Sequence, residues 1–104
     1  MMAATIISAG TLSGGGSPPG SPVAAIAVDD PFSNVGLTSV FTDKSTGFPT
    51  SWAWYMNASL FSTAQNPTFY WSSPGSFVIT MTAANSFGSS TSSPLTVTVY
   101  NYAP

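Results

Sequence analysis

The chain contains no cysteine and no histidine, and only one basic and three acidic residues occur among its 104 residues. Without cysteine it can form neither disulfides nor thiolate metal sites, and without histidine the usual zinc ligands are missing. One lysine cannot neutralise the phosphates of a nucleic acid or hold the chain at an anionic membrane surface. We therefore expect no metal, no cofactor, no nucleic acid and no membrane among its partners.

Long apolar runs are also missing from the sequence. The longest run is far shorter than the roughly 20 residues that a membrane-spanning helix needs. The first ten residues lack the basic start and the continuous apolar stretch of a secretory signal. If Met1 is the native start, we expect the protein to remain in the cytoplasm in which it is made.

Catalytic groups do not form a recognisable set. Asp29 and Asp30 are adjacent, so in an extended chain their side chains point to opposite faces, and we interpret them as turn residues beside Pro31. Serine and threonine are abundant, but no base is available to activate a hydroxyl group. Asp43 is expected to accept backbone hydrogen bonds in a turn. The sequence therefore predicts that the protein is not an enzyme.

The most regular feature of the chain is a series of short alternating segments. Residues 76–84 place Phe77, Ile79 and Met81 on one face and smaller or polar side chains on the other, which is typical of a half-buried strand. Strands are predicted at residues 23–28, 37–42, 51–56, 68–72, 76–84 and 94–100. Trp52 and Trp54 share a face and are expected in the core. The pattern predicts an all-β protein, an antiparallel β-sandwich.

The N-terminal part differs in composition from the rest. Residues 1–22 are rich in glycine, serine and proline, and we interpret them as an extended arm preceding a sandwich of residues 23–104. Fully extended, the arm would span about 70 Å at about 3.3 Å per residue. Its apolar side chains are expected to contact neighbouring subunits, and they are Met1, Met2, Ile6, Ile7 and Leu12. A disordered tail is the alternative interpretation.

Several separate segments resemble those of the PKD domain family, an immunoglobulin-like sandwich. They follow the family's order and spacing and comprise residues 22–28, 41–47, 49–54, 65–68, 73–77, 85–88 and 95–99. The resemblance implies a PKD-type, immunoglobulin-like β-sandwich. It also implies a spacer or binding module, as found in exported enzymes, cell-surface proteins and virus particles.

Departures from the family pattern point to possible contact residues. The loop at residues 55–59 lacks the family's two acidic residues, which removes the expected oxygen ligands for calcium. Ser39 occupies a usually inward position and Val40 an outward one, so either the strand carries a bulge or Val40 faces a partner. Tyr70 is expected to point outward between two inward aromatic side chains, and Tyr102 could anchor an interface at the carboxyl end.

These features favour a non-enzymatic structural or interaction protein. Our first prediction is a bacteriophage capsid decoration or cement protein in the virion, assembled in the host cytoplasm, that anchors through its N-terminal arm. Its partners would be subunits such as the major capsid protein, and copies of itself. The alternative is an extracellular accessory module that binds carbohydrate or protein, and a plain spacer is a third interpretation. The predicted contact residues are Met1, Met2, Ile6, Ile7, Leu12, Val40, Tyr55, Tyr70 and Tyr102.

Overall fold

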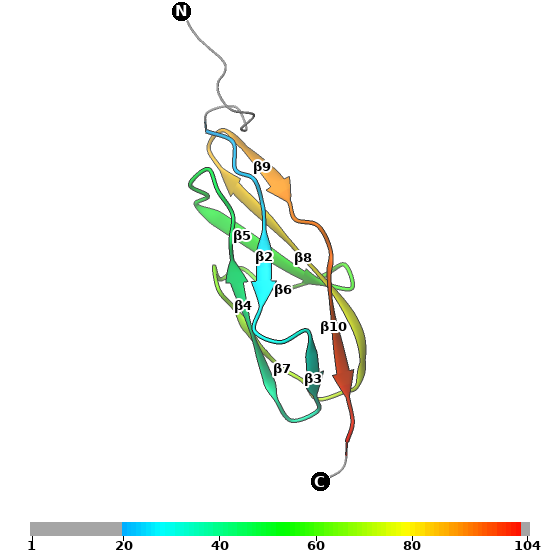
Figure 1. The fold of residues 1–104 in the computed structure, drawn as a ribbon. Helices are drawn as coiled ribbons and strands as arrows, with labels where there is room; N and C mark the ends of the chain where they lie inside the picture. Colours follow the sequence, from blue (N-terminus) through cyan, green and yellow to red (C-terminus); the bar gives the residue numbers. More distant parts are fainter. Residues whose placement is uncertain (1–19, 103–104) are drawn as a thin grey trace, which may run out of the picture.

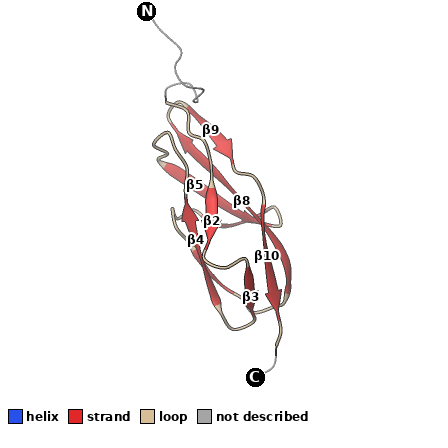
Figure 2. Cartoon of the chain, in the orientation of Figure 1, coloured by secondary structure: helices blue, strands red, loops and turns tan. Residues whose placement is uncertain are grey.

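The computed structural model describes residues 20–102, and the regular structure of this part of the chain consists of strands (Figure 1; Figure 2). The strands are β2 (Ile26–Val28), β3 (Phe32–Asn34), β4 (Thr38–Asp43), β5 (Ser51–Met56), β6 (Ser59–Ser62), β7 (Thr68–Tyr70), β8 (Gly75–Asn85), β9 (Gly88–Thr91) and β10 (Leu95–Tyr100). Within these residues, no helix is long and apolar enough to cross a membrane.

The described strands form two sheets. The large sheet has the order β3-β10-β8-β5-β6, with β9 paired to the far part of β8, and the small sheet has the order β2-β4-β7. Neighbouring strands are antiparallel except for β3 and β10, which run parallel. The chain therefore passes from the small sheet in β2 to the edge of the large sheet in β3, as Figure 1 shows.

The predicted alternation in β8 places the core. Ile79, Met81 and Ala83 are fully buried, and they pack with aromatic side chains contributed by β4, β5 and the end of β7. The buried hydrophobic side chains of the described part are Phe41, Trp54, Trp71, Ile79, Met81, Ala83, Val97 and Val99. The core position of Trp54 is confirmed, and Trp52 is partly buried against the same cluster.

The structure contains a strand near each predicted one and adds three short strands within the described residues. These are β3, β6 and β9, which the sequence pattern did not reveal. The predicted β-sandwich is confirmed, with the difference that the β3–β10 pair is parallel. Figure 1 shows β2 and β10 pointing the same way, and β3, which follows β2 in the chain, pairs with Thr98–Tyr100 of β10 in the parallel sense.

Ser39 points into the core, where it binds the indole group of a buried tryptophan. Its hydroxyl group accepts a hydrogen bond of 2.8 Å from Nε1 of Trp71, and both side chains are buried. The pairing of β4 with β7 runs without a shift through Ser39 and Val40, so β4 has no bulge at this point. Val40 accordingly points outward, so the bulge interpretation is wrong, and contact of Val40 with a partner stays a prediction.

The β5–β6 hairpin was expected to be a loop. Asn57 and Ala58 both have positive φ values, 49° and 70°, which fits a two-residue hairpin turn. The side chain of Asn57 accepts a hydrogen bond from the amide of Val78 and fastens this turn to β8. The β5–β6 register shifts between Trp54 and Tyr55, and this irregularity hides the strand period of β6 from a sequence pattern.

Asp43 organises the turn that follows β4. Its carboxylate accepts hydrogen bonds from the amide of Ser45 (2.9 Å), from Nε1 of Trp52 (3.0 Å) and from the amide group of Gln65 (3.1 Å). The predicted backbone contact of Asp43 is therefore confirmed. Partial burial raises the pKa of Asp43, but these hydrogen bonds outweigh that effect and hold its pKa below the usual value.

This lowered pKa predicts an acid-dependent loss of stability. The ionised Asp43 carboxylate stabilises the folded state fully above its unfolded pKa of about 3.9, and this contribution disappears as the pH falls through the lower folded pKa. The effect should be small, below about 1 kcal/mol, because solvent screens a partly exposed carboxylate. Thermal unfolding of wild type and Asp43→Asn at pH 3 to 7 should therefore show a difference that shrinks below about pH 4. A difference independent of pH would contradict this role.

Candidate contact surface

The described residues contain no arrangement suited to catalysis or metal binding. No group of three or more His, Cys, Asp or Glu side chains within residues 20–102 lies close enough to hold a metal ion. The carboxylate of Asp29 accepts hydrogen bonds from the amides of Asp30 and Val40, and that of Asp30 accepts one from Phe32. Both carboxylates therefore serve the local backbone, as the turn interpretation predicted.

The outer face of the large sheet is free of charge. Because Ile79 and Met81 point inward, the alternate residues of β8 point away from the core, and their cross-strand partners share that direction. The large side chains at outward strand positions are Phe32, Tyr55, Leu60, Val78 and Tyr100. The threonines at outward strand positions are Thr80, Thr82, Thr91, Thr96 and Thr98. No charged residue occupies an outward position in the described strands of this sheet. Asp29 and Asp30 precede β3, where the Asp30 carboxylate accepts a hydrogen bond from the amide of Phe32, and Asp43 and Lys44 lie at the end of β4 in the small sheet.

Three aromatic side chains form a row at the β3–β10 edge of this face. The ring of Tyr100 lies 6.4 Å from that of Phe32 and 5.2 Å from that of Tyr102, with an interplanar angle of 21° in both pairs. The exposed fractions of Phe32, Tyr100 and Tyr102 are 60%, 37% and 69%. The backbone amide of Tyr102 donates a 2.9 Å hydrogen bond to the side chain of Asn34, which holds the chain end beside β3. We call Phe32, Tyr100 and Tyr102 the aromatic row.

The predicted contact residues do not gather at one place. Tyr102 belongs to the aromatic row, whereas Tyr55 is partly buried on β5, which is separated from β10 by β8. Val40 and Tyr70 are 42% and 60% exposed on the small sheet, where Ser39 and Phe69 point inward. Tyr55 and Tyr70 therefore lie on opposite outer faces and do not form a common stacking platform. The predicted arm contacts, Met1, Met2, Ile6, Ile7 and Leu12, lie outside the described residues.

The sequence analysis singled out neither Phe32 nor Tyr100 as a candidate contact residue. Phe32 follows the Asp-Asp-Pro turn, and no alternating run marks the three-residue strand β3 that carries it. Val78 could have been found, because the period of residues 76–84 already placed it opposite the buried face. The signal for the aromatic row is the spacing of Tyr100 and Tyr102, two residues apart on one face of an extended chain.

Comparisons with known proteins identify the fold. The PKD1 domain of Vibrio cholerae metalloprotease PrtV is similar at 26% identity and a TM-score of 0.64, over 78% of this chain and 99% of that one. The fibronectin(III)-like modules of Clostridium thermocellum CbhA are similar at 15% identity and a TM-score of 0.61, over 77% and 100% of the chains. A solution structure from Methanosarcina mazei is similar at 19% identity and a TM-score of 0.58, over 97% and 68%.

No curated protein sequence matches the chain. The family model of the PKD domain, in contrast, matches residues 13–99, which are most of the chain and include every described strand except the last residue of β10. Together with the immunoglobulin-like arrangement of the two sheets, this match shows that the chain belongs to the PKD domain family.

Proposed function

We propose that this PKD domain is a structural binding module that attaches to a larger protein assembly through the aromatic row and the uncharged outer face around it. PKD and fibronectin-like domains are generally non-catalytic interaction or accessory modules, although one similar domain comes from a protease. The main support for this proposal is the aromatic row, whose three exposed rings are nearly parallel and lie on a sheet face without charged strand residues.

The physical chemistry of this face suits docking to a neutral surface. Burial of apolar area is worth about 25 cal/mol per Å², and no charged side chain on the face has to be stripped of water when a partner covers it. Tyrosine adds hydroxyl groups that can hydrogen-bond at the rim, which is why tyrosine is enriched in interfaces. A neutral face therefore favours a partner surface that is itself uncharged.

The proposal also names the assembly to which the domain attaches. We propose the outer surface of a bacteriophage capsid, with the major capsid protein as the partner. Low charge supports it, since copies of a protein with a net charge of −2 repel one another weakly when they are packed side by side. Many weak contacts on a repeating lattice then add up through multivalency.

A second setting is an accessory module of a larger extracellular protein that binds carbohydrate or protein. The similarity to a PKD domain of a metalloprotease supports it, because that domain is one part of a longer enzyme. Exposed aromatic rings are also suited to stacking against the apolar faces of sugar rings. In this setting the same aromatic row would contact the ligand.

The aromatic row predicts a specific loss of binding. Replacing Phe32 and Tyr102 together by serine should lower the number of copies bound per particle by about tenfold or more, since each exposed aromatic anchor is worth about 1 kcal/mol or more in an interface. The measurement is cosedimentation of the purified full chain with particles from the native source.

Tyr70→Ser compares the aromatic row with the small sheet, because Tyr70, a contact residue predicted from the sequence, is equally exposed but lies on the opposite outer face. This variant should bind as wild type does. Full binding by the Phe32/Tyr102 variant would overturn the docking face. Failure of the wild type to bind particles, with row-dependent retention on an insoluble neutral polysaccharide, would replace the capsid setting by the accessory one.

A further inference from the structure

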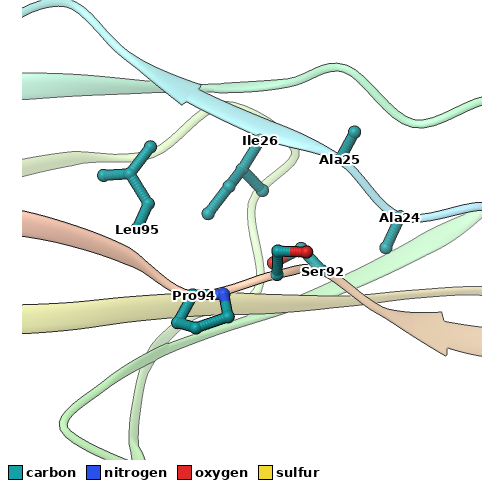
Figure 3. A pocket seen from close by; sticks show the side chains of 7 residues that line it. Ala24, Ala25, Ile26, Ser92, Pro94 and Leu95 are labelled. Atoms are coloured by element: carbon teal, nitrogen blue, oxygen red, sulfur yellow. The ribbon is translucent and has the colours of Figure 1, made fainter.

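A hollow lies at the edge of the sandwich, between the start of β2 in the small sheet and the start of β10 in the large sheet. Its volume is about 280 Å³, and it lies between residues 24–26 on one side and residues 92–95 on the other. Figure 3 shows the side chains of Ile26 and Leu95 pointing into the space between these two segments. The hollow exists because β3 covers only Thr98–Tyr100 of β10 and leaves the first half of that strand without a neighbour on this side. We call this region the seam.

The β10 wall of the seam has an open main-chain edge. The amide of Thr98 donates to the carbonyl group of Pro31, on the β3 side, so Thr96, two residues earlier, presents its main-chain groups to the same side. The cross-strand partner of Thr96 is Val78, whose amide and carbonyl groups both form hydrogen bonds with Asn57 and none with Thr96. Pro31 has no N–H to continue the ladder. Within residues 20–102, the amide and carbonyl groups of Thr96 therefore have no strand partner.

The β2 wall is open in the same way. Ala25 and Asp29 form their main-chain hydrogen bonds toward β4 and the turn after it, so Ile26, between them, turns its amide and carbonyl groups away from β4. The amide of Ala24 points in that direction too, since it donates to the hydroxyl group of Ser90 in β9. Ile26 thus faces the seam with unpaired main-chain groups, as far as the described residues show.

An extended peptide satisfies both features of the seam. Its main chain can continue the ladder on the free edge of β10, and an alternate side chain can fill the hollow between Ile26 and Leu95. The lining is uncharged and consists of alanine, isoleucine, serine, proline and leucine side chains. The fitting segment is therefore an uncharged strand with an aliphatic side chain.

We propose that the seam binds the N-terminal arm of a second copy of this chain, through a strand around residues 4–8. This segment, Ala-Thr-Ile-Ile-Ser, is uncharged, rich in β-branched residues and followed by a Gly/Ser/Pro-rich stretch that ends at the sandwich. Residues 1–19 precede the described part, and a chain of this length spans about 60 Å when extended, which is ample for reaching a neighbour.

A second copy is favoured over the same chain for a steric reason. The amide of Ala24 donates to Ser90 of β9, so the residues that lead from Gly20 to β2 already close the seam at this end. An arm that returned to its own seam would have to double back across this contact. A segment of another molecule enters the seam directly from solvent.

Arm exchange of this kind links copies head to tail, because the donor segment and the receiving seam are different surfaces. It is independent of the aromatic row, whose residues Phe32, Tyr100 and Tyr102 are not part of the seam. The proposal therefore goes beyond the docking function, and copies can associate even if the aromatic row binds nothing.

The test is complementation between two defective full-length chains. The arm variant carries Ile6→Asp and Ile7→Asp, and Thr11→Asp is its control with a charge elsewhere in the arm. The seam variant is Thr96→Pro, which removes the open amide of an exposed residue. Ala24→Arg, at a partly buried lining position whose side chain points to the side of residues 92–95 (Figure 3), is a second seam variant in case proline disturbs β10. Thermal unfolding checks that each variant is folded.

Sedimentation equilibrium should show concentration-dependent association of wild type and of Thr11→Asp. Each arm or seam variant alone should associate about tenfold or more weakly. The arm variant loses the aliphatic side chain that fills the hollow, and Thr96→Pro loses a main-chain hydrogen-bond donor while its ring obstructs the open edge. Mixing the arm variant with a seam variant should restore a 1:1 dimer, since one chain supplies an intact seam and the other an intact arm. The Phe32/Tyr102 variant should associate as wild type does.

Three results would overturn the proposal. Wild type could remain monomeric at all concentrations, the mixture could fail to form the 1:1 dimer, or the arm variant could associate as strongly as wild type. A monomeric wild type whose Thr96 amide is protected from hydrogen exchange only when the arm is intact would assign the seam to the chain's own arm instead.

Discussion

Replacing Trp54 by alanine is expected to remove most of the domain's stability. Trp54 is fully buried, and its ring packs against that of Phe41 with a centroid distance of 5.7 Å. Truncating a buried tryptophan to alanine costs about 3 to 5 kcal/mol, because apolar contacts are lost and a cavity remains. Small domains have a total stability of only about 5 to 15 kcal/mol. Thermal unfolding by circular dichroism should show a melting temperature lower by about 12 °C or more.

Two further variants make the Trp54 experiment specific. Tyr70→Ala removes an aromatic side chain of similar size from an exposed position on the small sheet and should change stability by no more than about 0.5 kcal/mol. Trp54→Phe should destabilise the domain less than Trp54→Ala does. Phenylalanine keeps an aromatic ring in the core, and it breaks no hydrogen bond, because Nε1 of Trp54 is buried without an acceptor among the described residues. Equal losses for Trp54→Ala and Tyr70→Ala would contradict the two-sheet core.

The core could be predicted from the sequence because it follows a local period. In β8, the alternation of large apolar and smaller side chains fixes which residues point inward, and the structure places Ile79, Met81 and Ala83 accordingly. Turn residues such as Pro74 and Gly75 limit this strand without any tertiary information. The eleven residues of β8 are enough to show an alternating pattern in the sequence, whereas the three residues of β3 are too few.

The features missed by sequence analysis depend on contacts between distant parts of the chain. The sequence analysis placed Ser39 at an inward position, but the reason for a buried serine lies in Trp71, 32 residues later, whose Nε1 donates a hydrogen bond to the Ser39 hydroxyl group. Likewise, β3 exists because it pairs with β10, nearly 70 residues away. No local pattern encodes such a pairing.

The candidate contact surface was predictable only in part. The outward positions of Tyr102 and Val78 follow from strand spacing alone. Phe32 lies on the same face only because the chain passes from the small sheet in β2 to the large sheet in β3. The seam is likewise a product of topology, since it arises where β3 begins too late to cover Thr96. Composition could reveal that the surface lacks charge, but not which face collects the aromatic rings.

Asn85 is expected to be the most important polar side chain for the stability of the sandwich. Its amide group donates to the carbonyl groups of Gly20 and Gly47, and its side-chain oxygen accepts from the amides of Phe87 and Gly88. It therefore joins the start of the described chain, the β4–β5 loop and the β8–β9 turn. Asn85→Ala should cost about 2 to 6 kcal/mol, since each of the four hydrogen bonds contributes about 0.5 to 1.5 kcal/mol.

Asn66→Ala is the matched control, because Asn66 is exposed and its side chain accepts one hydrogen bond, from the amide of Asp43. Its cost should be about 1 kcal/mol. Urea unfolding measures both variants, and a loss at Asn85 no larger than that at Asn66 would contradict the joining role.

Asn85→Asp separates the donated bonds from the accepted ones. The carboxylate keeps the acceptor for Phe87 and Gly88 but turns an oxygen toward the carbonyl groups of Gly20 and Gly47, so repulsion replaces two hydrogen bonds. This arrangement raises the pKa of the new carboxyl group in the folded state, because only its protonated form can donate. The stability deficit of Asn85→Asp relative to wild type should therefore be largest at neutral pH and shrink as the pH falls toward 4. A deficit that does not change with pH would show that the two donated bonds contribute little.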